Sequence, residues 1–64
     1  MFFNVNDIAA IRDHIYRHDG KLTFRDVHGA FSHMSTRDIH EIIDYLIQIN
    51  RVRMDEYTKR LYKN

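Results

Sequence analysis

Basic and aromatic side chains gather in residues 51–64, where their types suit contact with a polyanion. This segment holds five cations against two acids, Asp55 and Glu56, which gives a local charge of +3. Lysine and arginine neutralise phosphates and tyrosines stack on bases, so the segment is a candidate nucleic-acid interface. Exposed hairpin edges carry the same cations to prevent aggregation, which is a purely structural alternative. The side chains concerned are Arg51, Arg53, Tyr57, Lys59, Arg60, Tyr62 and Lys63.

A second set of polar side chains lies on one face of a helix that we expect over 36–49. Three of them are types that contact bases and phosphates in the major groove, and two are carboxylates. Carboxylates repel phosphates and reduce the counterion release that drives DNA binding. Residues 35–50 sum to −2, which argues against entry of this helix into the major groove. The first group is Arg37, His40 and Gln48, and the second is Glu41 and Asp44.

Histidines raise the question of a metal site, because the chain contains five of them. His14 and His18 are spaced i, i+4, which places both on one side of a helix. A bound metal needs a third and a fourth ligand, and nothing in the sequence directs Asp13 or Asp19 to the same point. The pattern favours surface histidines beside an apolar stripe, and we expect no metal and no other cofactor.

The overall composition describes one small domain over 1–64. With 64 residues, the chain is near the lower limit for folding around one core without disulfides or metal. It has no cysteine, which excludes disulfides and thiol nucleophiles, and its apolar runs are too short to span a membrane. It also lacks a nucleophile motif and a glycine-rich phosphate loop, so we do not expect an enzyme. The net charge of +1 neither supports nor excludes a nucleic-acid partner.

Capping residues and apolar periodicity predict three helices, at about 5–18, 24–31 and 36–49. Asn4, Thr23 and Ser35 are the expected N-caps, because each precedes an aspartate by three residues. The third helix is the most apolar, and its apolar arc must be covered by the rest of the chain. That arc consists of Ile39, Ile42, Ile43, Leu46, Ile47 and Ile49.

Four further expectations concern single positions. Gly20 should take positive φ where the first helix ends, and Asn50 should do the same after the third helix. Phe3 is expected to pair with Ile8 as a hydrophobic staple. Gly29 lies inside the second helix, where it costs about 1 kcal/mol relative to alanine, and we expect a close approach to a neighbouring backbone there.

Extended segments follow a different pattern. Residues 51–54 alternate charged and apolar types, residues 59–63 do so less cleanly, and a polar turn lies between them, which predicts a hairpin over 51–63. Residues 21–23 could add one short strand. The order of elements is helix, short strand, helix, tight turn, helix and hairpin. The predicted fold class is therefore mostly α with a small β-sheet, a winged helix-turn-helix with the hairpin as the wing.

The run from Leu22 to Leu46 resembles the C-terminal domain of the middle subunit of replication protein A, the eukaryotic single-stranded-DNA-binding complex. The resemblance is close over about 25 residues, and it extends to about 60 when the first helix and the hairpin are aligned by element order. The shared features have the same spacing without gaps. They are Leu22, Phe24 and Asp26, then His33, Met34 and Ser35, then Ile39, Asp44 and Leu46.

The resemblance implies a nuclear protein-recruiting module that acts in DNA replication and repair. Such a domain docks short helical segments of replication and repair proteins at the end of its third helix and across its sheet. Members of the family are acidic or neutral on that surface, whereas this chain is basic there, so its partners should be acidic or its recruiting role altered. An isolated domain of this kind should be a monomer. Carried over by position, the partner-binding residues are Ile49, Asn50, Arg51, Val52, Arg53 and Asn64.

A small winged-helix DNA-binding regulator from a virus, plasmid or microbe is the alternative. It would act in the cytoplasm and would dimerise to span two half-sites. The acidic face of the third helix favours the recruiting module, and the basic hairpin favours the DNA-binding regulator. The DNA contacts of the regulator would be Arg37, His40, Gln48, Arg51, Arg53, Lys59, Arg60 and Lys63.

Overall fold

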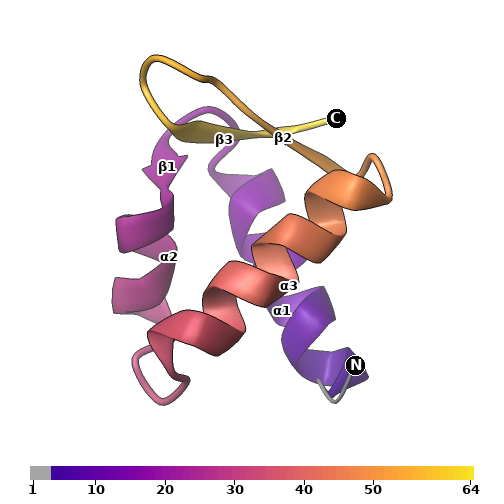
Figure 1. Ribbon diagram of the computed structural model, residues 1–64, viewed down its shortest axis with the longest axis vertical. Helices are drawn as coiled ribbons and strands as arrows, with labels where there is room; N and C mark the ends of the chain where they lie inside the picture. The colour runs from indigo at the N-terminus through magenta and orange to yellow at the C-terminus, as the bar shows by residue number, and fades with distance from the viewer. Residues whose placement is uncertain (1–3) are drawn as a thin grey trace.

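The computed structural model describes residues 4–64 as three helices and a small antiparallel sheet. The sheet lies across one end of the helices, and α3 crosses in front of α1 with α2 beside them (Figure 1). This confirms the predicted mostly helical class with a small sheet, and the arrangement is compatible with a winged helix. The elements are α1 (Val5–Arg17), β1 (Leu22–Thr23), α2 (Phe24–Ala30), α3 (Thr36–Gln48), β2 (Val52–Met54) and β3 (Arg60–Lys63).

The helices begin at side-chain caps that the sequence predicts. The Asn4 side chain accepts a hydrogen bond from the backbone N–H of Asn6, and the Ser35 hydroxyl accepts one from Asp38. Thr23 and Asp26 form a complete capping box, in which each side chain accepts from the other's backbone N–H. These bonds satisfy N–H groups that have no partner inside the helix, and they fix where α1, α2 and α3 start.

Each helix ends one residue before the end of its expected range, because His18, Phe31 and Ile49 are C-caps. Gly20 has φ of 76° and Asn50 has φ of 62°, as predicted. The prediction for Gly29 is wrong, because a Cβ built there meets no heavy atom within 4 Å. Phe3, half of the predicted staple, lies outside the described residues.

The strands form a sheet in the order β1-β3-β2, so the last strand in the chain is the central one. The predicted hairpin is present as β2 and β3, with Val52 opposite Lys63 and Met54 opposite Leu61. The short strand suggested by residues 21–23 is present as β1, and it places Leu22 opposite Leu61. The sheet thereby joins the turn after α1 to the C-terminal segment.

Every element except β1 contributes at least one buried side chain to a single core. Leucine, isoleucine and valine side chains from the helices meet those of β2 and β3, and Leu22 of β1 packs against their edge. Burying apolar area of this kind is the main favourable term in folding. The core residues are Ile11, Ile15, Val27, Ile39, Ile42, Ile43, Leu46, Val52 and Leu61.

Candidate interaction surface

The end of α3 is a fixed reversal of the chain rather than a frayed turn. The Asn50 N–H donates to the Ile47 carbonyl at 3.0 Å, and the Arg51 N–H donates to the Leu46 carbonyl at 2.9 Å. This pair of bonds is the Schellman arrangement, and the positive φ of Asn50 makes it possible. The reversal leaves the Ile49 side chain 42% exposed at the point where α3 turns into β2.

Two distant segments hold the Arg51 carbonyl in place. The Tyr16 hydroxyl of α1 donates to it at 2.9 Å, and the backbone N–H of Asn64 donates to it at 3.2 Å. The Asn64 side chain also donates to the Asn50 carbonyl at 3.0 Å. Because both lone-pair positions of the Arg51 carbonyl have donors, the backbone of residues 50 and 51 is tied to α1 and to the C-terminal segment.

Arg53 is oriented by the aromatic ring opposite it. Arg53 and Tyr62 are direct cross-strand partners, and the Arg53 guanidinium lies 4.4 Å from the centroid of the Tyr62 ring. The ring packs against Gly20, where an added Cβ would lie 2.6 Å from Tyr62 Cε2. A cation over an aromatic face is attracted by the ring quadrupole, so the arginine is positioned before any partner arrives.

Asp19 and Tyr16 tie the C-terminal strand to the end of α1. The backbone N–H of Lys63 donates to Asp19 Oδ1 at 2.7 Å, and the Lys63 ammonium lies 5.2 Å from the centroid of the Tyr16 ring. These contacts fix the end of β3 beside the Asn50 and Arg51 carbonyls, which accept hydrogen bonds from Asn64 and Tyr16. The C-terminal residues are therefore part of the surface.

The structure brings five of the six predicted partner-binding residues to one exposed surface, and we call this group the α3–β2 surface. Val52 is the exception, because its side chain is 1% exposed and belongs to the core. It supports the surface from beneath and offers a partner no contact. The α3–β2 surface consists of Ile49, Asn50, Arg51, Arg53 and Asn64, all of which are exposed.

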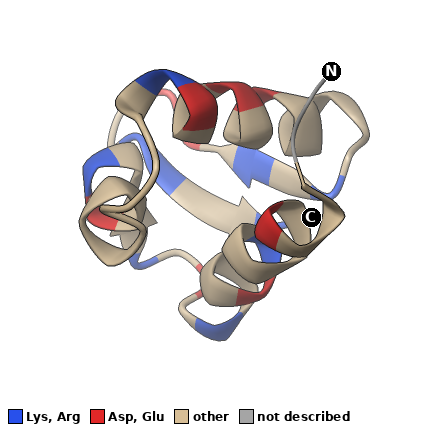
Figure 2. Cartoon of the chain, turned by 90° about the horizontal axis from the view of Figure 1, so that it is seen from below, with Lys and Arg blue, Asp and Glu red and all other residues tan. Residues whose placement is uncertain are grey.

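The outward face of α3 has a different electrostatic character. The Arg37 guanidinium lies 3.7 Å from a Glu41 carboxylate oxygen, and the His40 ring nitrogen lies 3.6 Å from Asp44. The basic groups proposed to contact DNA from this helix thus have acidic neighbours one turn away. Figure 2 shows acidic positions along α3 and basic positions along the strands. Gln48 is exposed at the C-terminal end of the same helix.

The hairpin cations form no ion pair within the described residues. In that part of the chain, ion pairs join Arg12 to Asp13 and Arg37 to Glu41, and the His40 ring lies 3.6 Å from Asp44. The cations concerned are Arg51, Arg53, Lys59, Arg60 and Lys63, all of which are exposed.

Asp55 accepts hydrogen bonds within the turn of the hairpin and forms no ion pair with the hairpin cations. Its Oδ1 accepts the backbone N–H of Tyr57 at 2.7 Å and that of Thr58 at 2.9 Å. The two backbone bonds hold the pKa of Asp55 below its usual range, with a smaller contribution from the charge of Arg53. The turn closes without glycine, because Lys59 takes φ of 62°. Tyr57 is 96% exposed at its tip.

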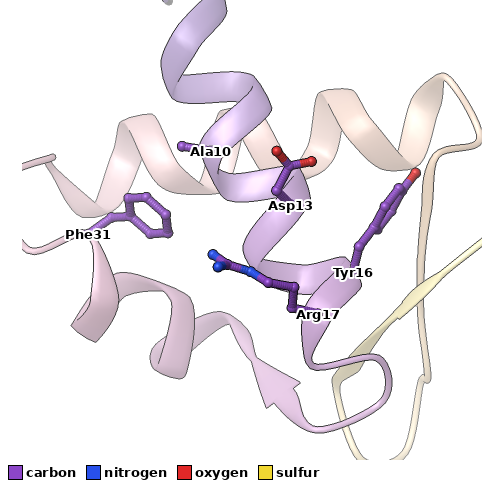
Figure 3. Close-up of a pocket in the computed structure, with 5 residues that line it drawn as sticks. All are labelled: Ala10, Asp13, Tyr16, Arg17 and Phe31. Carbon is purple, nitrogen blue, oxygen red and sulfur yellow. The ribbon is translucent and has the colours of Figure 1, made fainter.

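A shallow pocket lies between α1 and the end of α2, on another part of the molecule (Figure 3). Phe31 and Arg17 face this space, whereas Tyr16 points towards the chain after α3. Its lining holds one carboxylate and one guanidinium. The lining residues are Ala10, Asp13, Tyr16, Arg17 and Phe31.

The histidine pair of α1 packs as aromatic rings. The ring centroids of His14 and His18 are 5.0 Å apart, and His14 also contacts the Phe31 ring edge-on at 5.6 Å. Partial burial, with the charges of His18 and Arg17, lowers the pKa of His14. Across residues 4–64, no three histidine or acidic side chains gather as a metal site. No helix in that range is long and apolar enough to cross a membrane.

The supporting contacts of the α3–β2 surface were not found from the sequence. Tyr16 and Asp19 form hydrogen bonds with backbone groups 35 and 44 residues away in the sequence. Tyr62 contacts the Arg53 side chain on the neighbouring strand. The one related signal in the sequence is that Tyr62 lies among basic residues, a pattern that predicts stacking on nucleic-acid bases. Contacts to backbone N–H and carbonyl groups leave no pattern of side-chain types that could predict them.

Comparison with known proteins gives no match to this chain, whether among family models, curated proteins or solved structures. The function is therefore argued from the geometry and charge of the surfaces described above.

Proposed function

We propose that this chain is a protein-interaction module that docks short helical segments of partner proteins on the α3–β2 surface. The observation that supports this most is the fixed geometry of the surface around an exposed apolar side chain. Two donors hold the Arg51 carbonyl, and the Tyr62 ring orients Arg53. A preorganised surface loses little conformational freedom on binding, which favours affinity.

Ile49 supplies the apolar anchor of this proposed interface. It is 42% exposed and lies in the chain between Gln48 and Asn50, both of which are exposed and polar. Protein interfaces commonly combine an apolar centre with a polar rim. A helix laid across it would present apolar residues at i, i+3 and i+4. The area offered by five residues is small, so we expect affinity of about micromolar strength.

The resemblance of Leu22 to Leu46 to the replication protein A domain supports a more specific form of this proposal. In that form, the module belongs to a nuclear single-stranded-DNA-binding complex and recruits replication and repair proteins. The acidic outward face of α3 fits a module that binds protein better than one that inserts this helix into DNA.

A peptide-display selection tests the docking function without knowledge of the partner. Peptides of about four helical turns would be selected against the wild-type protein and against Ile49→Ser. We expect the enriched wild-type peptides to lose binding to Ile49→Ser. Val5→Ser is the matched control, because Val5 is 77% exposed at the first position of α1 and does not belong to the α3–β2 surface. Peptides that bind all three proteins equally would contradict docking at this surface.

A DNA-binding regulator is the second candidate, favoured by the hairpin cations that have no ion-pair partner in the described structure. An amide-shift NMR titration with duplex DNA, at low and then physiological salt, tests it. The DNA-binding function predicts saturable shifts on Arg37, His40 and the hairpin that weaken as salt rises. The docking function predicts no shifts on α3 and at most faint shifts on the hairpin.

A further inference from the structure

The cations of the α3–β2 surface, Arg51 and Arg53, are exposed and form no ion pair within the described residues. Two acids on the connected segments, Asp19 and Asp55, accept hydrogen bonds from backbone groups and form no ion pair with either arginine. Asp19 accepts from the Lys63 N–H, and Asp55 accepts from the Tyr57 and Thr58 N–H groups.

The Arg53 guanidinium and the backbone of Arg51 are also placed in advance of binding. The Arg53 guanidinium lies 4.4 Å from the Tyr62 ring centroid, and the Arg51 backbone is pinned through its carbonyl by Tyr16 and Asn64. Stacking on Tyr62 leaves the edge of the guanidinium fork free, and a carboxylate binds that fork in a bidentate manner. A fixed arginine loses less side-chain entropy when it forms such a pair than a mobile one.

The neighbouring helix restricts which anion can approach. Residues 35–50 of the α3 region sum to −2, and Asp44 lies one turn before Gln48 at the end of the helix. A long polyanion such as duplex DNA would run past these carboxylates and be repelled by them. A short acidic segment centred on Ile49 can contact Arg51 and Arg53 alone, and it gains the apolar contact that DNA cannot make.

We propose that the segment docked on the α3–β2 surface is acidic, with an apolar residue on Ile49 and carboxylates on Arg51 and Arg53. This inference rests on the proposed docking function and names the chemistry of its partner. Opposite charges across an interface direct the encounter and exclude partners of the wrong sign. A basic helical segment would place cations against two arginines and would be rejected.

The peptides selected on the wild-type protein provide the test. We expect them to be net negative, with acidic residues flanking an apolar one at helical spacing. One enriched peptide would be synthesised together with versions in which its acids become glutamine or lysine. We expect the glutamine version to bind about tenfold more weakly and the lysine version to show no saturable binding in an NMR titration.

Protein variants identify the arginines responsible. Arg51→Glu and Arg53→Gln should each weaken the acidic peptide about tenfold, and Arg51→Glu should restore binding to the lysine version. Arg37→Glu is the matched control, because Arg37 lies about 18 Å from Ile49 along α3. Thermal unfolding by circular dichroism would establish that each variant is folded, and Arg51→Lys should keep the affinity of the wild type.

The possible failures are distinguishable. Selected peptides that depend on Ile49 but are neutral or basic would overturn the acidic partner and leave the docking function intact. Peptides that bind Ile49→Ser as well as wild type would remove the docking function itself. An oligonucleotide that displaces the acidic peptide and shifts the same amides more strongly would assign the two arginines to nucleic acid.

Discussion

Gly29 and Gly20 show how much a single missing Cβ matters in this chain. An alanine Cβ at Gly29 would meet no heavy atom within 4 Å, whereas at Gly20 it would lie 2.6 Å from Tyr62 Cε2 with φ at 76°. We expect Gly29→Ala to raise the free energy of unfolding by about 0.5–1 kcal/mol, because glycine carries a conformational-entropy cost inside a helix. Urea denaturation would measure it, and a loss of stability would show that the helix has a packing constraint at this position.

Gly20→Ala is the matched substitution, and we expect it to lower the free energy of unfolding. It forces a side chain into the left-handed region and against the ring that orients Arg53, so we expect a loss of about 1–2 kcal/mol. The Tyr62 ring must also shift, which would change the amide shifts of Arg53 in an NMR spectrum. A stable variant with unchanged Arg53 shifts would contradict the support that Gly20 is inferred to give to the α3–β2 surface.

Single positions were predictable from the sequence where the determinant was local. Asn50 takes positive φ because its side chain tolerates the left-handed region better than a branched one. The alternation of residues 51–54 also contained the information that Val52 points inwards while Arg51 and Arg53 point out. Val52 was assigned a partner contact only through its position in the resemblance, and the structure buries it.

The stability of the hairpin turn should depend on pH in the acidic range. Hydrogen bonds from Thr58 and Tyr57 lower the pKa of Asp55, so its ionised form stabilises the folded turn above its unfolded pKa of about 3.9. That contribution is lost as the pH falls through the lower folded pKa. We expect Asp55→Asn to be less stable than wild type near neutral pH, with the difference shrinking below about pH 4.

Urea midpoints across an acid pH series would measure this effect. Glu56→Gln is the control, because Glu56 is the adjacent carboxylate and the described structure records no hydrogen bond to it. If Asp55→Asn kept the full pH dependence of the wild-type free energy of unfolding, that dependence would come from other carboxylates. Asp26 is the first of these, since its bonds from Thr23 lower its pKa in the same way.

Elements were predictable because caps and periodicity are local, whereas the order of strands was not. Asn4, Thr23 and Ser35 fix the helix starts through bonds to backbone groups two or three residues away. The pairing of β1 with β3 joins Leu22 to Leu61, and a two-residue strand has too little pattern to specify its neighbour. The contacts of Tyr16 and Asp19 depend on that arrangement, so the candidate surface could be proposed from the sequence but the contacts that support it could not.

At the scale of the whole molecule, each strand of the sheet contacts a different helix, and the central strand β3 joins the other two strands. Leu61 is fully buried, and its strand contacts β1, β2 and α1. A domain of this length has a total stability of about 3–10 kcal/mol, and removing a buried leucine side chain costs about 2–5 kcal/mol. We expect Leu61→Ala to unfold helices and sheet together, because one core serves both.

Its matched control is Met54→Ala, at the directly opposite position of β2. Met54 is 41% exposed, so its truncation should cost less than about 1 kcal/mol. Far-ultraviolet circular dichroism would report the helices, and NMR amide shifts of residues 51–63 would report the sheet. Coincident transitions would establish one cooperative unit that carries the α3–β2 surface. If the helices persisted after the sheet had melted, helices and sheet would be independent folding units. The α3–β2 surface would then not depend on the core that we infer to support it.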